Sequence, residues 1–203
     1  IVLDILAHND WQRPVYFVTG YHNDAMGLEE YFQLEGLAYR LVPLKSENRS
    51  WVDYGRIETD ILYNNMMDKF VWGGANDEKV NIDYNHRRTI TVVRARLSYA
   101  RLAKELVSEG KNEKAVQVLD RCMEALPLSN IPYDPYFPDI IEGYFLAGNT
   151  DKAVNLTNDF CNHYYEQLDY YLKQDPYIVG SALYEIQLAI QLTSRIADAC
   201  SDA

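Results

Sequence analysis

The chain has 203 residues, 48% of them apolar, which is typical of a globular protein with enough material for a hydrophobic core. Its net charge of −11 argues against nucleic acid as a partner, because the phosphates would be repelled. No apolar run approaches the roughly 18 residues that a membrane-spanning helix needs. Cys122, Cys161 and Cys200 follow no zinc or redox spacing, so we expect small buried side chains, with one disulfide and a free thiol as the alternative.

The chain begins without an initiator Met and without the basic start of a signal peptide. Residues 1–10 have the apolar pattern of an amphipathic helix, and this pattern indicates a helix that starts before residue 1. We therefore expect the chain to be a piece of a longer protein.

A small α/β unit is predicted at the N-terminal end, over residues 1–80. Its two expected strands are a β-rich run near 15–19 and an alternating run near 37–42. One or two helical turns over 28–34 are expected between them, which completes a strand, short helix, strand arrangement.

A polar loop over 45–56 and a helix over 57–70 follow this unit. The pair Gly73-Gly74 lacks the residues of a phosphate-binding loop and indicates a helix stop. A soft domain boundary is expected between 72 and 85. The rest of the chain, 85–203, is predicted to be helical.

Two similar short segments, which start 38 residues apart, divide this helical region. One runs from Gly110 to Ala115 and the other from Gly148 to Ala153. Each reads Gly, polar, polar, acid, Lys, Ala. Glycine adopts the left-handed conformation that closes one helix, and Asn or Thr then caps the next. The two segments therefore predict antiparallel helix pairs.

The expected helices of this region are 88–109, 112–126, 136–147, 150–172 and 177–199. The first pair fits the tetratricopeptide pattern at eight positions, which are Tyr99, Leu102, Ala103, Leu106, Ala115, Leu119, Cys122 and Pro127. The second pair keeps Tyr144 and Ala153 but has Thr157, lacks the closing Pro and is longer than the usual repeat. We predict an α+β fold, mostly α, in which tetratricopeptide-like helix pairs follow the small α/β unit.

The triplets His-Asn-Asp that begin at His8 and His22 are the clusters most like an acid-base or metal site. Such a site would combine the two histidines with Asp24 or Glu29. No HxH, HExxH or DxD spacing is present, and Asn and Asp are common in turns. We favour the turn interpretation and predict no catalytic residue, no metal ligand and no cofactor in this chain.

Arg87, Arg94 and Arg101 recur every seven residues and would share one face of the expected helix 88–109. A basic stripe in an acidic protein is a candidate surface for an anionic partner. The alternative, which we favour, is that these arginines pair with acidic side chains of neighbouring elements.

Seventeen tyrosines are present, and many of them lie in the second half of the chain. Tyrosine has an apolar ring and a polar tip, which suits recognition of peptides or sugars. We expect a minority to line a groove and name Tyr136, Tyr144 and Tyr171 as candidates beside the arginines. The other tyrosines of this half are Tyr133, Tyr164, Tyr165, Tyr170, Tyr177 and Tyr184.

Three segments carry a resemblance to a known family: Ile5 to Phe17, Gly27 to Pro43, and Asp60 to Met67 with the Trp72-Gly73-Gly74 that follows. They resemble the soluble C-terminal region of large Bacteroidetes membrane proteins of unassigned function. The membrane part of that family is similar to protein O-mannosyltransferases.

The resemblance implies that any sugar transfer belongs to the membrane part, so no catalytic residue carries over to this chain. His8 stands where the relatives lead us to expect Asn. The resemblance also implies a place on the periplasmic side of the inner membrane, with the membrane reached only through the other part of the protein.

The leading hypothesis is a non-catalytic periplasmic interaction domain whose helical repeats bind a protein or glycoprotein, as acceptor or assembly partner. One alternative is a sugar-binding or enzymatic domain that uses the N-terminal unit and its histidines. Another is a purely structural domain that packs on the parent protein's membrane part.

Overall fold

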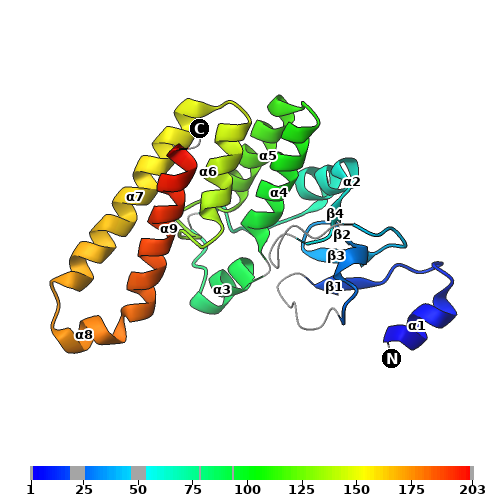
Figure 1. Ribbon diagram of the computed structural model, residues 1–203, viewed down its shortest axis with the longest axis horizontal. Coiled ribbons are helices and arrows are strands. Elements are labelled where there is room, and N and C mark those ends of the chain that lie inside the picture. Colours follow the sequence, from blue (N-terminus) through cyan, green and yellow to red (C-terminus); the bar gives the residue numbers. More distant parts are fainter. Residues whose placement is uncertain (1, 19–25, 47–53, 78, 93, 202–203) are drawn as a thin grey trace.

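The computed structural model describes residues 2–18, 26–46, 54–77, 79–92 and 94–201 (Figure 1). The N-terminal elements are α1 (Val2–Asn9), β1 (Tyr16–Val18), η2 (Glu29–Tyr31), β2 (Phe32–Leu34), β3 (Ala38–Leu41), β4 (Arg56–Ile57), α2 (Thr59–Asn64) and η3 (Asn65–Lys69). The helices that follow are α3 (Tyr84–Val92), α4 (Ala95–Ser108), α5 (Asn112–Ala125), α6 (Phe137–Leu146), α7 (Thr150–Leu172), α8 (Pro176–Ser181) and α9 (Leu183–Ser201). The fold is α+β and mostly α, as predicted.

The strands form a mixed sheet in the order β1-β3-β2-β4, antiparallel except for the parallel pair β2–β4. The two expected strands are confirmed as β1 and β3. The expected helical turns over 28–34 are wrong in their second half: a single 3-10 turn, Glu29–Tyr31, leads into the strand Phe32–Leu34. All three residues of this strand are buried, and it pairs on both sides, so tertiary pairing decides its conformation.

Strand β4 lies at the junction of the expected loop 45–56 and the expected helix 57–70, because Arg56 belongs to that loop and Ile57 to that helix. Residues 47–53 of the expected loop are outside the described residues. The helix expected at 57–70 is confirmed as α2, which begins at Thr59 and continues into the π-helical turn η3.

Two expected long helices are interrupted. The segment 88–109 is divided between α3 and α4, and Arg94 adopts the left-handed conformation with φ of 56°. The β-branched residues Thr89 to Val92 before this break lower helix propensity. The segment 177–199 is likewise divided into α8 and α9, with Ala182 between them. The helices α5, α6 and α7 are confirmed close to their expected limits.

The glycine turns close the helices as predicted. Gly110 has φ of 75°, its N–H donates to the carbonyl of Val107, and the N–H of Lys111 donates to the carbonyl of Leu106. This is the Schellman pattern, and Gly148 repeats it after α6. The predicted capping by Asn or Thr is wrong. Asn112 and Thr150 are the first helical residues of α5 and α7, and the residues at the cap positions, Lys111 and Asn149, make no side-chain capping bond.

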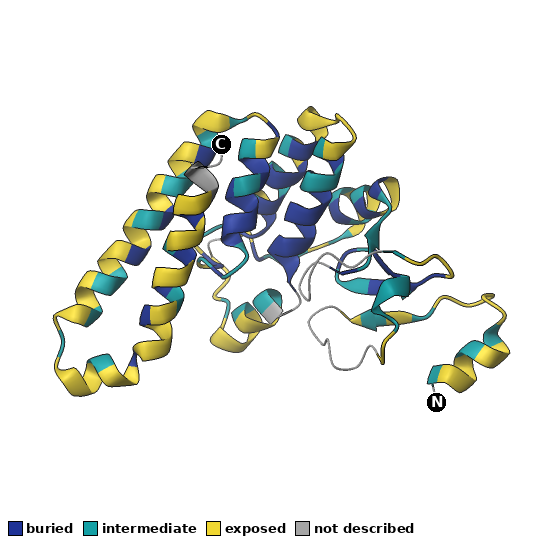
Figure 2. Cartoon of the chain, in the orientation of Figure 1, coloured by how far each residue is buried: buried dark blue, intermediate teal, exposed yellow. Residues whose placement is uncertain are grey.

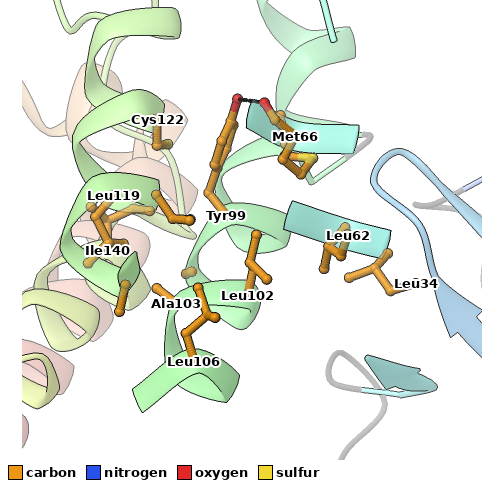
Figure 3. Close-up of a cluster of buried hydrophobic side chains, with 14 of the residues drawn as sticks. Leu34, Leu62, Met66, Tyr99, Leu102, Ala103, Leu106, Leu119, Cys122 and Ile140 are labelled. Atoms are coloured by element: carbon orange, nitrogen blue, oxygen red, sulfur yellow. Dashed lines mark hydrogen bonds between the residues drawn. The ribbon is translucent and has the colours of Figure 1, made fainter. Parts of the chain in front are cut away.

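One hydrophobic cluster joins the sheet to the helices (Figure 3). Leu34 of the sheet, Leu62 of α2 and Leu102 of α4 all belong to it. The residues at the first seven tetratricopeptide positions are buried in the same cluster. The repeat assignment and the boundary between two domains stay predictions, but the two parts share this core.

A second cluster lies between α6, α7 and α9. Its buried members are Phe137, Ile141, Phe160, Tyr164, Ala189, Leu192 and Ile196. Helix α9 runs back along α7, so the two helices and α8 form a hairpin at the opposite end of the molecule from the sheet (Figure 1).

Candidate interaction surface

The arginines of the candidate basic stripe, Arg87, Arg94 and Arg101, do not lie together on the surface. Arg94 and Arg101 are each only 7% exposed, and Arg87 lies half-buried on a different helix, α3. The break at Arg94 removes the continuous helix that the seven-residue spacing requires. The three arginines therefore do not form one exposed face. The favoured alternative, that they pair with acidic side chains of neighbouring elements, stays a prediction.

Arg101 connects α4 to the sheet. Its Nη1 donates to the hydroxyl of Tyr39 at 3.1 Å, and its Nη2 donates to the carbonyl of Gly55 at 2.9 Å. The rings of Tyr39 and Tyr54 stack with centroids 4.7 Å apart. Burial raises the pKa of Tyr54 to about 12, although the nearby charges of Arg94 and Arg101 oppose the shift. This group joins the two parts of the fold.

The three candidate tyrosines do not gather at one site. Tyr144 is fully buried in α6, and its hydroxyl donates to Oδ1 of Asp120 at 2.7 Å. Tyr136 is half-buried at the start of α6. Tyr171 is half-buried near the end of α7, where its ring lies 5.5 Å from that of Tyr170. Any role of these residues in binding stays a prediction.

The histidine cluster is described only in part, because His22 and Asp24 fall outside the described residues. His8 is exposed on α1, with its Nδ1 2.8 Å from the carbonyl oxygen of Asp4. A shallow cleft of about 450 Å³ beside His8 is lined by residues 5, 8, 9 and 12–15, and Glu29 is not among them. Nothing in this part of the chain brings His8 and Glu29 to one pocket.

Within the described ranges, no group of three or more His, Cys, Asp and Glu side chains is placed to hold a metal ion. Cys122 is fully buried, and burial raises the pKa of its thiol to about 12, as expected for a packing residue. Cys161 is half-buried, and the side chain of Cys200 lies outside the description. Of the helices that the structure describes, none is long and apolar enough to cross a membrane.

Large apolar side chains are exposed along residues 165–185, which form the end of α7, all of α8 and the start of α9, and also along residues 3–18 around α1 and β1. We call the segment 165–185 the distal end. Figure 2 shows that most of it is exposed. Its large exposed side chains, with their exposed fractions, are Tyr165 59%, Tyr170 61%, Leu172 68%, Tyr177 84%, Ile178 42%, Leu183 52% and Tyr184 71%.

The lengths of the helices explain this exposure. Helix α7 has 23 residues and α6 has 10, which correspond to about 35 Å and about 15 Å of helix. Only the first part of α7 can therefore pack on α6. Among the described elements, α8 and α9 contact α7 beyond α6, and of the residues of the distal end only Ala182 is buried, with Ile186 buried directly after this segment.

The sequence analysis noted the tyrosines of this segment but named only Tyr171 among them as a binding candidate. The signal that identifies the distal end is the difference in length between the expected helices 136–147 and 150–172. When a helix extends beyond the neighbouring helix on which it packs, the apolar residues past the end of that neighbour are left exposed unless another element covers them.

Residues 1–61 match the protein family described as TMEM260-associated domain 2. That family is related to TMEM260, a membrane protein like the protein O-mannosyltransferases. No curated protein and no solved structure matches the chain. The matched residues contain α1, the sheet and the first residues of α2, so the similarity ends before the helical region begins.

Proposed function

We propose that this chain is a non-catalytic interaction domain that docks a protein or glycoprotein partner through the distal end of its helical hairpin. The observation that carries the proposal is the number of large apolar side chains exposed within this one hairpin end, from Tyr165 to Tyr184. Monomeric proteins rarely expose a large apolar area without a partner for it. Tyrosine is also enriched in the cores of protein interfaces.

We further propose that the domain belongs to a glycosyltransferase-like membrane protein and lies on the periplasmic side of the inner membrane. The similarity of residues 1–61 to a TMEM260-associated domain supports this link. The distal end lies opposite the sheet, which carries the similarity, so a partner bound there would leave the sheet uncovered (Figure 1). The domain would then hold an acceptor or an assembly partner close to the membrane enzyme.

The test is site-specific photo-crosslinking in the full-length parent protein, in its own cells. A photoreactive residue replaces Tyr177, which is 84% exposed at the distal end. The control places the same residue at Glu113, which is exposed on α5. We expect a discrete crosslinked partner from position 177 and none from position 113. Equal crosslinking from both positions, or none from 177, contradicts the proposal.

The same exposed side chains also suit a structural role, in which the distal end packs on the parent's own membrane part. The crosslink separates the two functions. A bond formed within one polypeptide, at the distal end, supports the structural role, whereas a bond to a second polypeptide supports docking of a partner.

A further inference from the structure

The distal end carries unbalanced negative charge around its apolar side chains. Residues 165–185 contain four carboxylates and a single lysine. The lysine, Lys173, pairs with Asp169 of the same helix. Asp175 accepts a hydrogen bond from the N–H of Tyr177 and so caps α8. Glu166 and Glu185 have no ion-pair partner among the described residues and remain available to a cation.

The shape of this segment restricts what can cover it. Tyr177 and Tyr184 are 84% and 71% exposed, values that belong to a projecting surface. Both lie where the chain turns from α7 through α8 into α9 (Figure 1). A partner must therefore bring its own apolar face against the hairpin.

We propose that the distal end binds a cationic amphipathic helix of a partner protein. This inference rests on the proposed docking function and names the chemistry of the partner. The apolar face of such a helix covers the tyrosine and leucine side chains, as in other complexes of amphipathic helices. Its lysines and arginines meet Glu166 and Glu185 at the edge, and they also favour the faces of exposed tyrosine rings.

Charge also argues against two other occupants. An anionic lipid surface would repel the carboxylates of the distal end. A second copy of the chain would bring a net charge of −11 and the same carboxylates to the contact. A partner of opposite charge has neither cost.

The experiment uses an amphipathic helical peptide of leucine and lysine, with a twin in which glutamate replaces every lysine. Calorimetry measures the binding of each peptide to the whole 203-residue chain at low and at moderate salt. We expect the lysine peptide to bind, with an affinity that falls as salt rises, and the glutamate peptide not to bind.

Two variants with matched controls separate site binding from general attraction to an acidic protein. Tyr177→Ser with Tyr184→Ser should weaken binding about tenfold or more, whereas Tyr84→Ser, at an equally exposed tyrosine of α3, should not. Glu166→Gln with Glu185→Gln should flatten the salt dependence. Glu113→Gln, on α5, is the control for that change. Thermal melting by circular dichroism should be unchanged in every variant, because these side chains are exposed.

Several results would overturn the inference. One is an affinity for the lysine peptide that is unchanged by the tyrosine substitutions, which would indicate non-specific attraction. Equal binding of the glutamate peptide would show that the partner need not be cationic. Binding of the chain to phosphatidylglycerol vesicles would indicate a lipid surface instead. A dimer that Tyr177→Ser with Tyr184→Ser abolishes would indicate a second copy of the chain. If crosslinking at position 177 finds a partner while the peptides show no charge preference, the docking function stands and this inference fails.

Discussion

Nη1 of Arg96 donates a hydrogen bond of 2.8 Å to Oδ2 of Asp134, and both side chains are buried, at 0% and 5% exposure. The same guanidinium donates to the carbonyls of Leu126, Ile131 and Pro132. These three carbonyls belong to the segment between α5 and α6. Because this segment is not helical, its carbonyls have no helical N–H groups to pair with, and Arg96 pairs with them instead. One side chain of α4 therefore holds the connection between the two helix pairs.

Replacing Arg96 by Met should lower the free energy of unfolding by about 3–5 kcal/mol, because it leaves the Asp134 carboxylate buried and unpaired. Denaturant unfolding measures the change. The control is Arg121→Met, since Arg121 makes only a partly exposed ion pair with Glu124 on the same helix. That substitution should cost less than about 1 kcal/mol. Similar losses in the two variants would mean that the buried pair has no special role.

Replacing Arg101 by Ala should lower stability by about 2–3 kcal/mol, since the Tyr39 hydroxyl and the Gly55 carbonyl lose a charged donor. The thermal unfolding temperature is the first measurement. Near-ultraviolet circular dichroism is the second, because the stacked rings of Tyr39 and Tyr54 should lose their fixed environment. A variant that melts with the parent protein would show that Arg101 does not join helix and sheet.

Replacing Gly110 by Ala should cost about 1–2 kcal/mol, because an L-residue is strained at φ of 75° while the space around it is open. Gly180 provides the comparison: it lies within α8, has ordinary φ and also has open space. Gly180→Ala should therefore leave stability unchanged or raise it slightly. Equal effects at the two positions would contradict the assigned turn.

Replacing Ala115 by Leu should cost about 1–3 kcal/mol, because Ala115 is fully buried and the added methyl groups must displace their neighbours. Glu113→Leu, two residues earlier on the exposed side of α5, is the control and should change stability little. Chemical denaturation compares the two variants. If Ala115→Leu unfolds with the parent, α5 does not approach its neighbours closely at this position.

Alkaline pH should destabilise the fold through buried tyrosines. Burial raises the pKa of Tyr99 to about 12, and its hydroxyl accepts from Nε1 of Trp72 at 3.0 Å and donates to the carbonyl of Met66. In the unfolded chain the tyrosine has its ordinary pKa of 10.0, so this stabilisation is complete below pH 10 and is lost as the pH rises towards the folded pKa of about 12.

Unfolding free energies measured at several pH values, with phenolate absorbance in parallel, test this expectation. Tyr99→Phe should reduce the slope above pH 10.0, the unfolded pKa, although it also lowers stability at neutral pH. A stability profile that is flat up to pH 12, or a slope unchanged in the variant, would contradict the burial of this group.

Local chemistry in the sequence was sufficient for most of the helices. Gly110 and Gly148 end α4 and α6 because a left-handed residue with no side chain closes a helix regardless of its surroundings. The apolar period that follows each glycine then locates α5 and α7. The pairing of the four strands could not be predicted from the sequence in the same way. Phe32–Leu34 is too short to show a period, and its partners, Ala38–Leu41 and Arg56–Ile57, lie on either side of it.

The candidate site depended still more on tertiary structure. The seven-residue spacing of Arg87, Arg94 and Arg101 implies one face only if the helix is continuous, and the left-handed Arg94 interrupts it. Helical character, acidic charge, abundant tyrosine and tight glycine turns all follow from local sequence and composition. Only the packing decided which tyrosines are exposed, because burial depends on the length of the neighbouring helix, and α6 ends long before α7 does.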